Sequence, residues 1–225
     1  MATPSRLRLC IQAWIFPAIF DRAFFSSAFD RAAKPVLFVL LSLPLGWLVF
    51  AILGELSVPG SHLGADPAVE VVRFLGEWSI RLLLLTLSVS SVRRIARFPK
   101  VLQLRRMIGL FAFSYVVCHF TAYLGFLAEF DLVLIEEDLV ERTYITVGFT
   151  GLLLLVPLAV TSTNGWRRRL GATWRKLHRA IYIIVALGLV HLAWLTKDQY
   201  GEVVLYSLIF VVLMLERVVS RRKTR

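Results

Sequence analysis

Long apolar stretches alternate with short, arginine-rich polar segments along this chain of 225 residues. The apolar stretches are residues 36–53, 74–92, 107–128, 144–161, 180–196 and 203–215. Each predicts a membrane-spanning helix, because a helix needs about 20 residues to cross a hydrocarbon core of about 30 Å. A hydrophobic content of 58% and a mean hydropathy of +0.72 support this interpretation. The pattern therefore predicts an all-α integral membrane protein, a bundle of six transmembrane helices.

The segment before the first apolar stretch has a different character. Residues 7–29 are interrupted by Pro17 and carry Asp21 and Arg22, which favours an interfacial amphipathic helix over a membrane span or a cleaved signal peptide. We therefore expect an N-terminal cytoplasmic segment (1–35), a transmembrane domain (36–215) and a basic cytoplasmic tail (216–225). The sequence shows no internal repeat and no low-complexity linker.

The net charge of +11 is unevenly distributed. Basic residues concentrate before the first span, in residues 93–106, in residues 162–179 and in the tail, which are alternate connections of a six-span chain. Since basic loops stay in the cytoplasm, both termini are predicted to be cytoplasmic. The loop after the third span is acidic, with Glu129, Asp131, Glu136, Glu137, Asp138 and Glu141. Membrane lipid thus accounts for the basic clusters, and no nucleic-acid partner is expected.

Two histidines lie deep within apolar stretches. His119 follows Arg106 by 13 residues and His191 follows Arg179 by 12, so both are expected roughly 18–20 Å from the inner face. Two histidines at matching depth on two helices predict axial ligands of a haem iron, and the alternative is a pair of core histidines bonded to backbone or hydroxyl groups. His178, near the inner face, is either a ligand of a second haem or a solvated interfacial residue.

The remaining candidate chemistry is limited. Cys10 and Cys118, the second expected to be buried beside His119, allow neither a disulfide framework nor a thiolate metal cage. Without a C-x-x-C-H motif, a haem would be held by coordination and packing, as b-type haem. Glycine-rich nucleotide-binding motifs are also absent from the sequence. Arg81, within the second apolar stretch, is expected either to bind a haem propionate or to extend toward the outer headgroups.

Motifs in the same order over residues 36–215 resemble those of the MsrQ (YedZ) family of membrane proteins. They are His62-Leu-Gly-Ala-Asp-Pro67, Arg105-Arg-Met-Ile-Gly-Leu110 with Cys118-His119, Thr161-Ser-Thr163, and Arg169-Leu-Gly171 with Trp174-Arg-Lys-Leu-His178 and Tyr182. The resemblance implies a ferric-reductase-like six-helix domain in the bacterial inner membrane. It also implies one or two b-type haems ligated by His119, His178 and His191. FMN is allowed as a further cofactor, although no residue here matches a site for it.

The resemblance further implies a role in electron transfer. Members of the family pass electrons from the quinone pool or a cytoplasmic flavin reductase to MsrP, a periplasmic molybdenum-cofactor partner that reduces methionine sulfoxide. Ferric-reductase-like domains commonly carry two histidines on each of two helices, but arginine stands at both Arg105 and Arg106. Because a guanidinium cannot ligate iron, an inner haem is expected to have His178 on one side and Arg105 or Arg106 at its propionates.

Two rival functions stay open at this point. The chain could be a stand-alone ferric or quinone-linked cytochrome b with another electron acceptor. It could also belong to a different class, a small transporter or proton channel that uses its buried histidines as a relay. The visible spectrum separates the classes, because only a haem protein has a Soret band.

Overall fold

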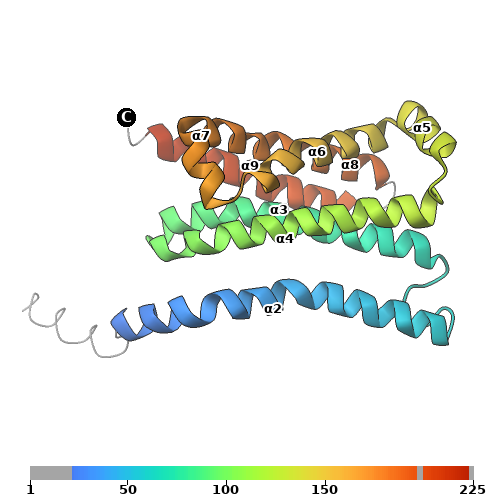
Figure 1. Cartoon of the computed structure of the whole chain (residues 1–225), viewed down its shortest axis with the longest axis horizontal. Helices are drawn as coiled ribbons and strands as arrows, with labels where there is room; N and C mark the ends of the chain where they lie inside the picture. The colour runs from blue at the N-terminus through green and yellow to red at the C-terminus, as the bar shows by residue number, and fades with distance from the viewer. Residues whose placement is uncertain (1–21, 197–199, 223–225) are drawn as a thin grey trace, which may run out of the picture. The chain divides into compact units, whose positions relative to one another are not determined.

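A computed structural model describes residues 22–196 and 200–222, which are helical apart from their connections (Figure 1). The main helices are α2 (Arg22–Ser57), α3 (Pro67–Ile95), α4 (Leu102–Ala122), α5 (Leu132–Glu141), α6 (Thr143–Val160), α7 (Asn164–Leu177), α8 (Ile181–Leu195) and α9 (Tyr200–Arg222). Single turns flank some of them: η1 (Pro99–Val101), the π-helical η2 (Tyr123–Leu127) and η3 (His178–Ala180). The described part of the chain divides into two units between Ser42 and Leu43, a boundary that lies within α2.

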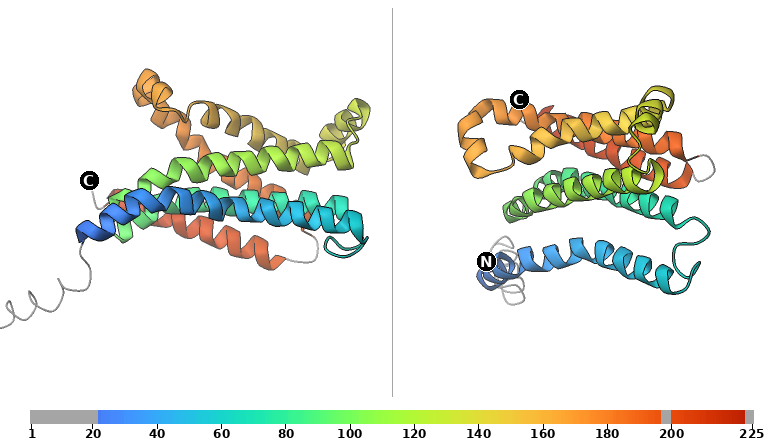
Figure 2. Two further views of the ribbon diagram at one scale, coloured as in Figure 1. Left: turned by 60° about the horizontal axis from the view of Figure 1, so that its bottom comes forward. Right: turned by 45° about the vertical axis from the view of Figure 1, so that its right-hand side comes forward.

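In the unit of residues 43–225, two antiparallel helix pairs form the main framework. Helix α3 packs along α4, and α6 packs along α8, while α9 packs against α3 and α8 (Figures 1 and 2). The buried core includes Leu75, Leu87, Tyr115 and Val185, which come from α3, α4 and α8. These pairs place α3, α4, α6 and α8 around a common interior.

Within residues 22–196 and 200–222, five helical segments are long and apolar enough to cross a membrane: Ala32–Ser57, Pro99–Leu127, Thr143–Val160, Asn164–Leu195 and Tyr200–Ser220. The chain is thus a multi-pass membrane protein. Helix α3 has 29 residues but carries Glu77 and Arg81 within its apolar stretch, which lowers its hydropathy. That α3 forms a sixth span, and that both termini are cytoplasmic, stay predictions.

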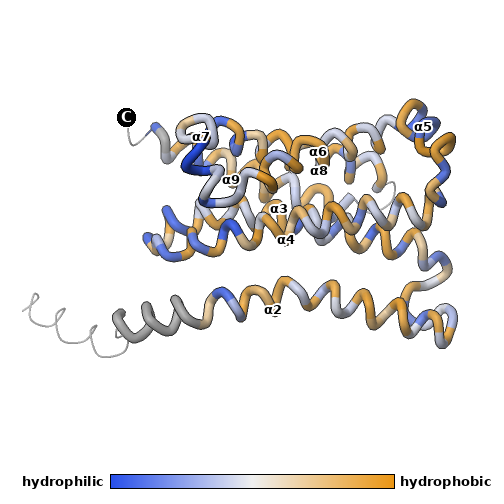
Figure 3. The backbone as a smooth tube through the Cα atoms, in the orientation of Figure 1, coloured by the Kyte–Doolittle hydropathy of each residue, from blue (hydrophilic) through white to orange (hydrophobic). Residues whose placement is uncertain are grey.

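Two connections predicted as loops are helices. Asp131 caps α5 by accepting a hydrogen bond from the Val133 amide at 2.8 Å, so most of the acidic loop is helical. Thr163 caps α7 in the same way, and α7 turns sharply at Gly171, whose φ of 50° suits glycine. Helix α7 is strongly polar, and α5 is only ten residues long with four acids among its apolar residues, so neither stands out in a search for long apolar stretches. Figure 3 shows the polar positions of α7 and α5 at opposite ends of the framework.

The predicted boundaries fare differently. Residues 1–21 lie outside the described part, whereas residues 22–29 of the predicted interfacial helix are already part of α2. Helix α9 extends well beyond the apolar residues 203–215 at both ends, so the last stretch is long enough to span. Asp66 caps α3, with Pro67 at its first turn, as expected for this pair. Cys118 is exposed, so the expectation that it is buried was wrong.

Candidate haem site

Helices α3, α4, α6 and α8 enclose a cavity of about 540 Å³. Its lining is mainly apolar, and the set includes Ile80, Leu83, Phe120, Ile145, Phe149, Leu152, Leu155, Ile184, Leu192 and Leu195. His119 and His191 line it, whereas a few charged side chains occur toward its polar end. A concave, mostly apolar site with a few convergent polar groups is typical of cofactor binding.

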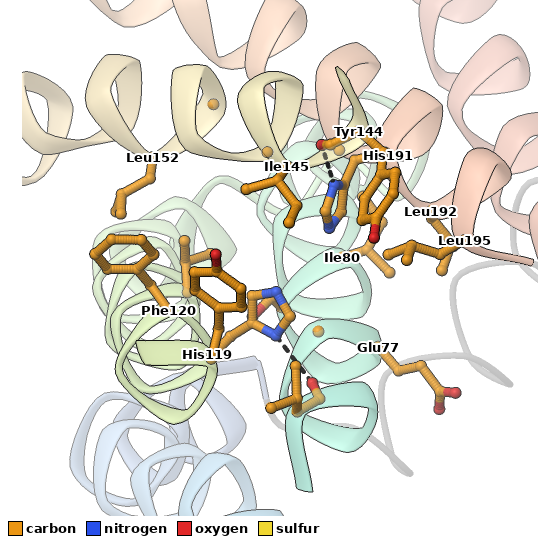
Figure 4. A pocket seen from close by; sticks show the side chains of 18 of the residues that line it. Glu77, Ile80, His119, Phe120, Tyr144, Ile145, Leu152, His191, Leu192 and Leu195 are labelled. Atoms are coloured by element: carbon orange, nitrogen blue, oxygen red, sulfur yellow. Dashed lines mark hydrogen bonds between the residues drawn. The ribbon is translucent and has the colours of Figure 1, made fainter. Parts of the chain in front are cut away.

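The two predicted histidines face one another inside this cavity (Figure 4). Their ring centroids lie 6.2 Å apart, and the ring planes are nearly perpendicular at 82°. Two imidazoles that bind one metal ion from opposite sides at about 2 Å have centroids roughly 6 Å apart. The structure therefore brings His119 and His191 to the separation that axial ligation of one iron requires.

Each ring is oriented by a backbone carbonyl. His119 Nδ1 lies 2.9 Å from the carbonyl oxygen of Val72, and His191 Nδ1 lies 2.7 Å from that of Tyr144. Because a carbonyl oxygen only accepts, Nδ1 carries the proton on both rings and Nε2 keeps its lone pair. Metal-ligating histidines are commonly held by such a bond from the other ring nitrogen.

Two glycines make these contacts sterically feasible. A Cβ at Gly76 would lie 3.0 Å from His119 Cε1, and a Cβ at Gly148 would lie 2.8 Å from His191 Nδ1. Each glycine follows its carbonyl-bearing residue by four positions, so it lies one turn along the helix, where that carbonyl points. The absence of a side chain at each glycine thus leaves the space that the imidazole occupies when it bonds to the backbone carbonyl.

The same arrangement occurs twice in the chain. Adding 72 to the numbers of Val72, Gly76 and His119 gives Tyr144, Gly148 and His191. The pairs α3–α4 and α6–α8 therefore contribute equivalent halves of the site. No internal repeat was recognised from the sequence, because only a few positions are equivalent and the residues between them differ. The sequence separation between Gly76 and His119 equals that between Gly148 and His191, and this equality could have revealed the repeat.

Two arginines that sequence reasoning did not single out also line the cavity. Arg73 on α3 and Arg142 at the start of α6 are both about half exposed. Arg73 pairs with Glu70 at 2.8 Å, and Arg142 pairs with Asp138 at 3.1 Å. The Asp138 carboxylate holds the pKa of Arg142 above its usual value. These side chains mark the polar end of the cavity.

Arg81 has protein partners in this structure. It bonds to Glu77 at 3.0 Å, to Glu202 at 3.4 Å and to the Tyr206 hydroxyl at 2.7 Å. Glu77 and Glu202 line the cavity, whereas Arg81 is not among its described lining residues. The half-buried guanidinium thus finds its anions within the protein.

His178 lies away from the His119–His191 cavity, at the start of η3. Its Nε2 is 3.1 Å from Thr161 Oγ1, and its ring stacks on Trp174 at a centroid distance of 4.0 Å. Thr161 Oγ1 already donates to the Pro157 carbonyl, so it accepts from His178 Nε2. His178 Nε2 could ligate iron only after its hydrogen bond to Thr161 is broken.

Basic side chains gather near that end of the helices. Arg106 is exposed, whereas Arg105 is half-buried and its charge interacts with that of Arg217. Arg217 is only 6% exposed and donates to the Leu87 carbonyl at 2.6 Å. Its Nε and Nη1 are buried and have no hydrogen-bond partner among the described residues. The face of the guanidinium lies over the Tyr182 ring, 4.9 Å from its centroid.

Residues 75–189 match the family described as ferric reductase like transmembrane component. The chain is also similar to proteins named protein-methionine-sulfoxide reductase heme-binding subunit MsrQ. The relative from Caulobacter vibrioides is 44% identical over 80% of this chain and 84% of its own length. The relatives from Herminiimonas arsenicoxydans and Xanthomonas campestris pv. campestris (strain 8004) are 40% and 42% identical, over 82% and 86% of this chain and 84% and 89% of their own lengths.

The helix pairs and the histidine-lined cavity agree with the ferric-reductase-like class of membrane proteins. At this identity and coverage, the chain belongs to the MsrQ family within that class. This confirms the family resemblance drawn from the motifs of the sequence.

Proposed function

We propose that this chain is a b-type cytochrome subunit that carries electrons across the bacterial inner membrane, with one haem held by His119 and His191. The observation that carries the proposal is the facing pair of rings, 6.2 Å apart, each with Nε2 left free to ligate. The names of the relatives, which specify a heme-binding subunit, support it. Bound haem supplies one-electron redox chemistry, and the protein sets its ligation and surroundings.

The apolar lining of the cavity supports haem as its ligand, in addition to the two histidines. Gly76 and Gly148 leave room for the rings, and the apolar walls formed by α4, α6 and α8 suit the porphyrin faces. The sequence has no C-x-x-C-H motif, so the proposed attachment is by coordination and packing alone. FMN stays a further candidate cofactor, with no residue of the described chain assigned to it.

The proposed direction of electron flow follows the charge distribution. The basic helix α7 and the acidic helix α5 lie at opposite ends of the framework (Figure 3). We infer that α7 faces the cytoplasm, where quinol in the lipid or a flavin reductase supplies electrons. The partner at the α5 end is then a periplasmic MsrP-like molybdenum-cofactor reductase, on which sulfoxide reduction takes place.

A second, inner haem is proposed at His178. The unpaired Nε and Nη1 of buried Arg217, with the charge of Arg105 nearby, support an anionic group such as a propionate at this end. Subtracting 72 from His178 gives Arg106, so the equivalent position on α4 offers no iron ligand. Such a haem would have one histidine ligand and bind more weakly than the outer one.

The rival class, a transporter or proton channel, is less well supported. A proton relay needs ring nitrogens that exchange protons with successive polar groups, whereas both Nδ1 atoms here donate to helix carbonyls. The lining near the rings is mainly apolar. A stand-alone cytochrome b would share the haem site and differ only in its electron acceptor.

The test is the visible spectrum of the protein purified after expression with haem supplied. His119→Ala and His191→Ala should each lose the low-spin spectrum of the outer haem, because one axial position becomes open. His62→Ala, which changes an exposed loop histidine, is the matched control and should leave the spectrum unchanged. The proposal fails if the wild-type protein has no Soret band, or if either variant keeps a full bis-histidine spectrum.

A further inference from the structure

Among the described residues, two acids, Glu77 and Glu202, and two arginines, Arg73 and Arg142, line the polar end of the haem cavity. Glu77 and Glu202 line the cavity, but both bond to Arg81, at 3.0 and 3.4 Å. Arg81 thus pairs with both acids that face the cavity from α3 and α9, and its single charge offsets one of the two negative charges. Arg73 and Arg142 remain as the cationic lining residues of this end.

Neither arginine makes an ion pair with an acid that lines the cavity, although Arg73 lies near enough to Glu77 and Glu202 to interact with both electrostatically. Arg73 pairs with Glu70, and this exposed i,i+3 pair is of the kind that contributes little and exchanges easily. Arg142 bonds through Nε to Asp138, whose carboxylate is buried and also accepts from the Tyr123 hydroxyl at 2.7 Å. A guanidinium has five N–H donors, so the bond to Asp138 positions Arg142 without exhausting it.

We propose that Arg73 and Arg142 bind the two propionates of the outer haem, with Asp138 as the residue that positions Arg142. This rests on the proposed function, because it concerns the haem held by His119 and His191. Arginine suits the task because its planar fork binds a carboxylate with two parallel hydrogen bonds. The two arginines belong to α3 and to the start of α6, so one comes from each half of the repeated site.

The assignment also identifies the edge at which electrons leave. Asp138 belongs to α5 and bonds to two cavity-lining residues, Tyr123 and Arg142, so the acidic helix is anchored to the wall of the haem site. Glu136, Glu137 and Glu141 of α5 are exposed beside it. The propionate edge of the haem thus lies beside an acidic surface that a partner with a basic patch could cover.

The experiment compares haem with its dimethyl ester, in which both carboxylates are blocked. Apoprotein made without haem is loaded in detergent with either form, and transfer to excess apomyoglobin is followed by absorbance. The wild-type protein should release the ester at least about 10-fold faster than haem, since losing one charge-assisted pair of hydrogen bonds costs about that factor. Arg73→Gln and Arg142→Gln should each lower the ratio of the ester release rate to the haem release rate. In the double variant this release ratio should be near one.

Two further measurements separate ligand binding from a structural role. Each glutamine variant should also lower the haem midpoint potential, because a nearby cation favours the reduced form, which carries one more negative charge. Arg168→Gln, an exposed change on α7, should alter neither the ratio nor the potential. Asp138→Asn should partly lower the ratio of the ester release rate to the haem release rate. Arg142→Lys should retain the haem midpoint potential, because the charge is kept, and should lower this release ratio in part.

The proposal is overturned if the glutamine variants keep the wild-type ratio between haem and ester. That outcome, together with loss of the low-spin spectrum in His119→Ala and His191→Ala, would reject only the propionate assignment. If those histidine variants keep the spectrum, the proposed haem site itself is wrong. A wild-type protein that releases both forms at the same rate would also refute the role of Arg73 and Arg142.

Discussion

Replacing Gly148 with alanine should weaken haem binding without unfolding the protein. The new Cβ would lie 2.8 Å from Nδ1 and 2.9 Å from Cε1 of His191. A relaxed contact needs about 3.5 Å, so the ring or α6 must shift by about 0.7 Å. The ring cannot retreat freely, because its Nδ1 bonds to the Tyr144 carbonyl at 2.7 Å.

The magnitude follows from that conflict. Overpacking by one methyl group costs about 1–3 kcal/mol, and loss of a bond that orients a metal ligand commonly costs about 10- to 100-fold in affinity. At about 1.4 kcal/mol per tenfold change, the two estimates agree, so the haem dissociation constant should rise about 10- to 100-fold. Gly76→Ala, with a closest approach of 3.0 Å to His119, should have a smaller effect.

The assay is titration of apoprotein with haem, followed by the Soret band, alongside a thermal unfolding curve. Gly46→Ala is the matched control, because a Cβ at Gly46 meets nothing within 4 Å. It should bind haem like the wild-type protein. The steric argument is refuted if Gly148→Ala and Gly46→Ala bind haem with equal affinity and give the same low-spin spectrum.

Three other changes test separate parts of the account. His178→Ala should lower the haem content per chain while leaving the outer low-spin signal intact; unchanged stoichiometry would mean that the inner haem does not exist. Reversing exposed Glu136, Glu137 and Glu141 to lysine should slow association with the proposed periplasmic partner, and more at low salt than at high salt, because such charges mainly steer encounter. Haem content should not change, and equal association rates would exclude α5 as the docking surface. Arg81→Gln should lower thermal stability, since Glu77 and Glu202 lose their partner; an unchanged unfolding temperature would mean that these ion pairs contribute nothing to stability.

The sequence predicted those parts of the site that depend on local pattern. Apolar length located the spanning segments, and counting residues from the basic boundaries placed His119 and His191 at one depth. The structure brings these rings together, as that count required. The depth of a residue in the membrane can be predicted from the sequence, because a helix rises by a constant amount per residue.

Other features depend on contacts between helices and could not be read in this way. Gly76 and Gly148 matter only because a ring from another helix approaches each of them. Arg73 resembles any surface arginine until the cavity is seen, and Arg81 attracted attention although Glu202 and Tyr206, far along the chain, satisfy it. Asp138 was grouped with the other acids of its segment, yet it is buried and bonded to Tyr123.

The electron paramagnetic resonance spectrum of the oxidised wild-type protein tests the central claim most directly. His119 and His191 are held with ring planes 82° apart, and perpendicular axial imidazoles give ferric haem a strongly anisotropic low-spin signal. The account predicts this signal in the wild-type protein and its loss in both His119→Ala and His191→Ala. A signal that persists in either variant, or a wild-type spectrum that lacks the strongly anisotropic signal or is typical of parallel imidazoles, would contradict the assignment.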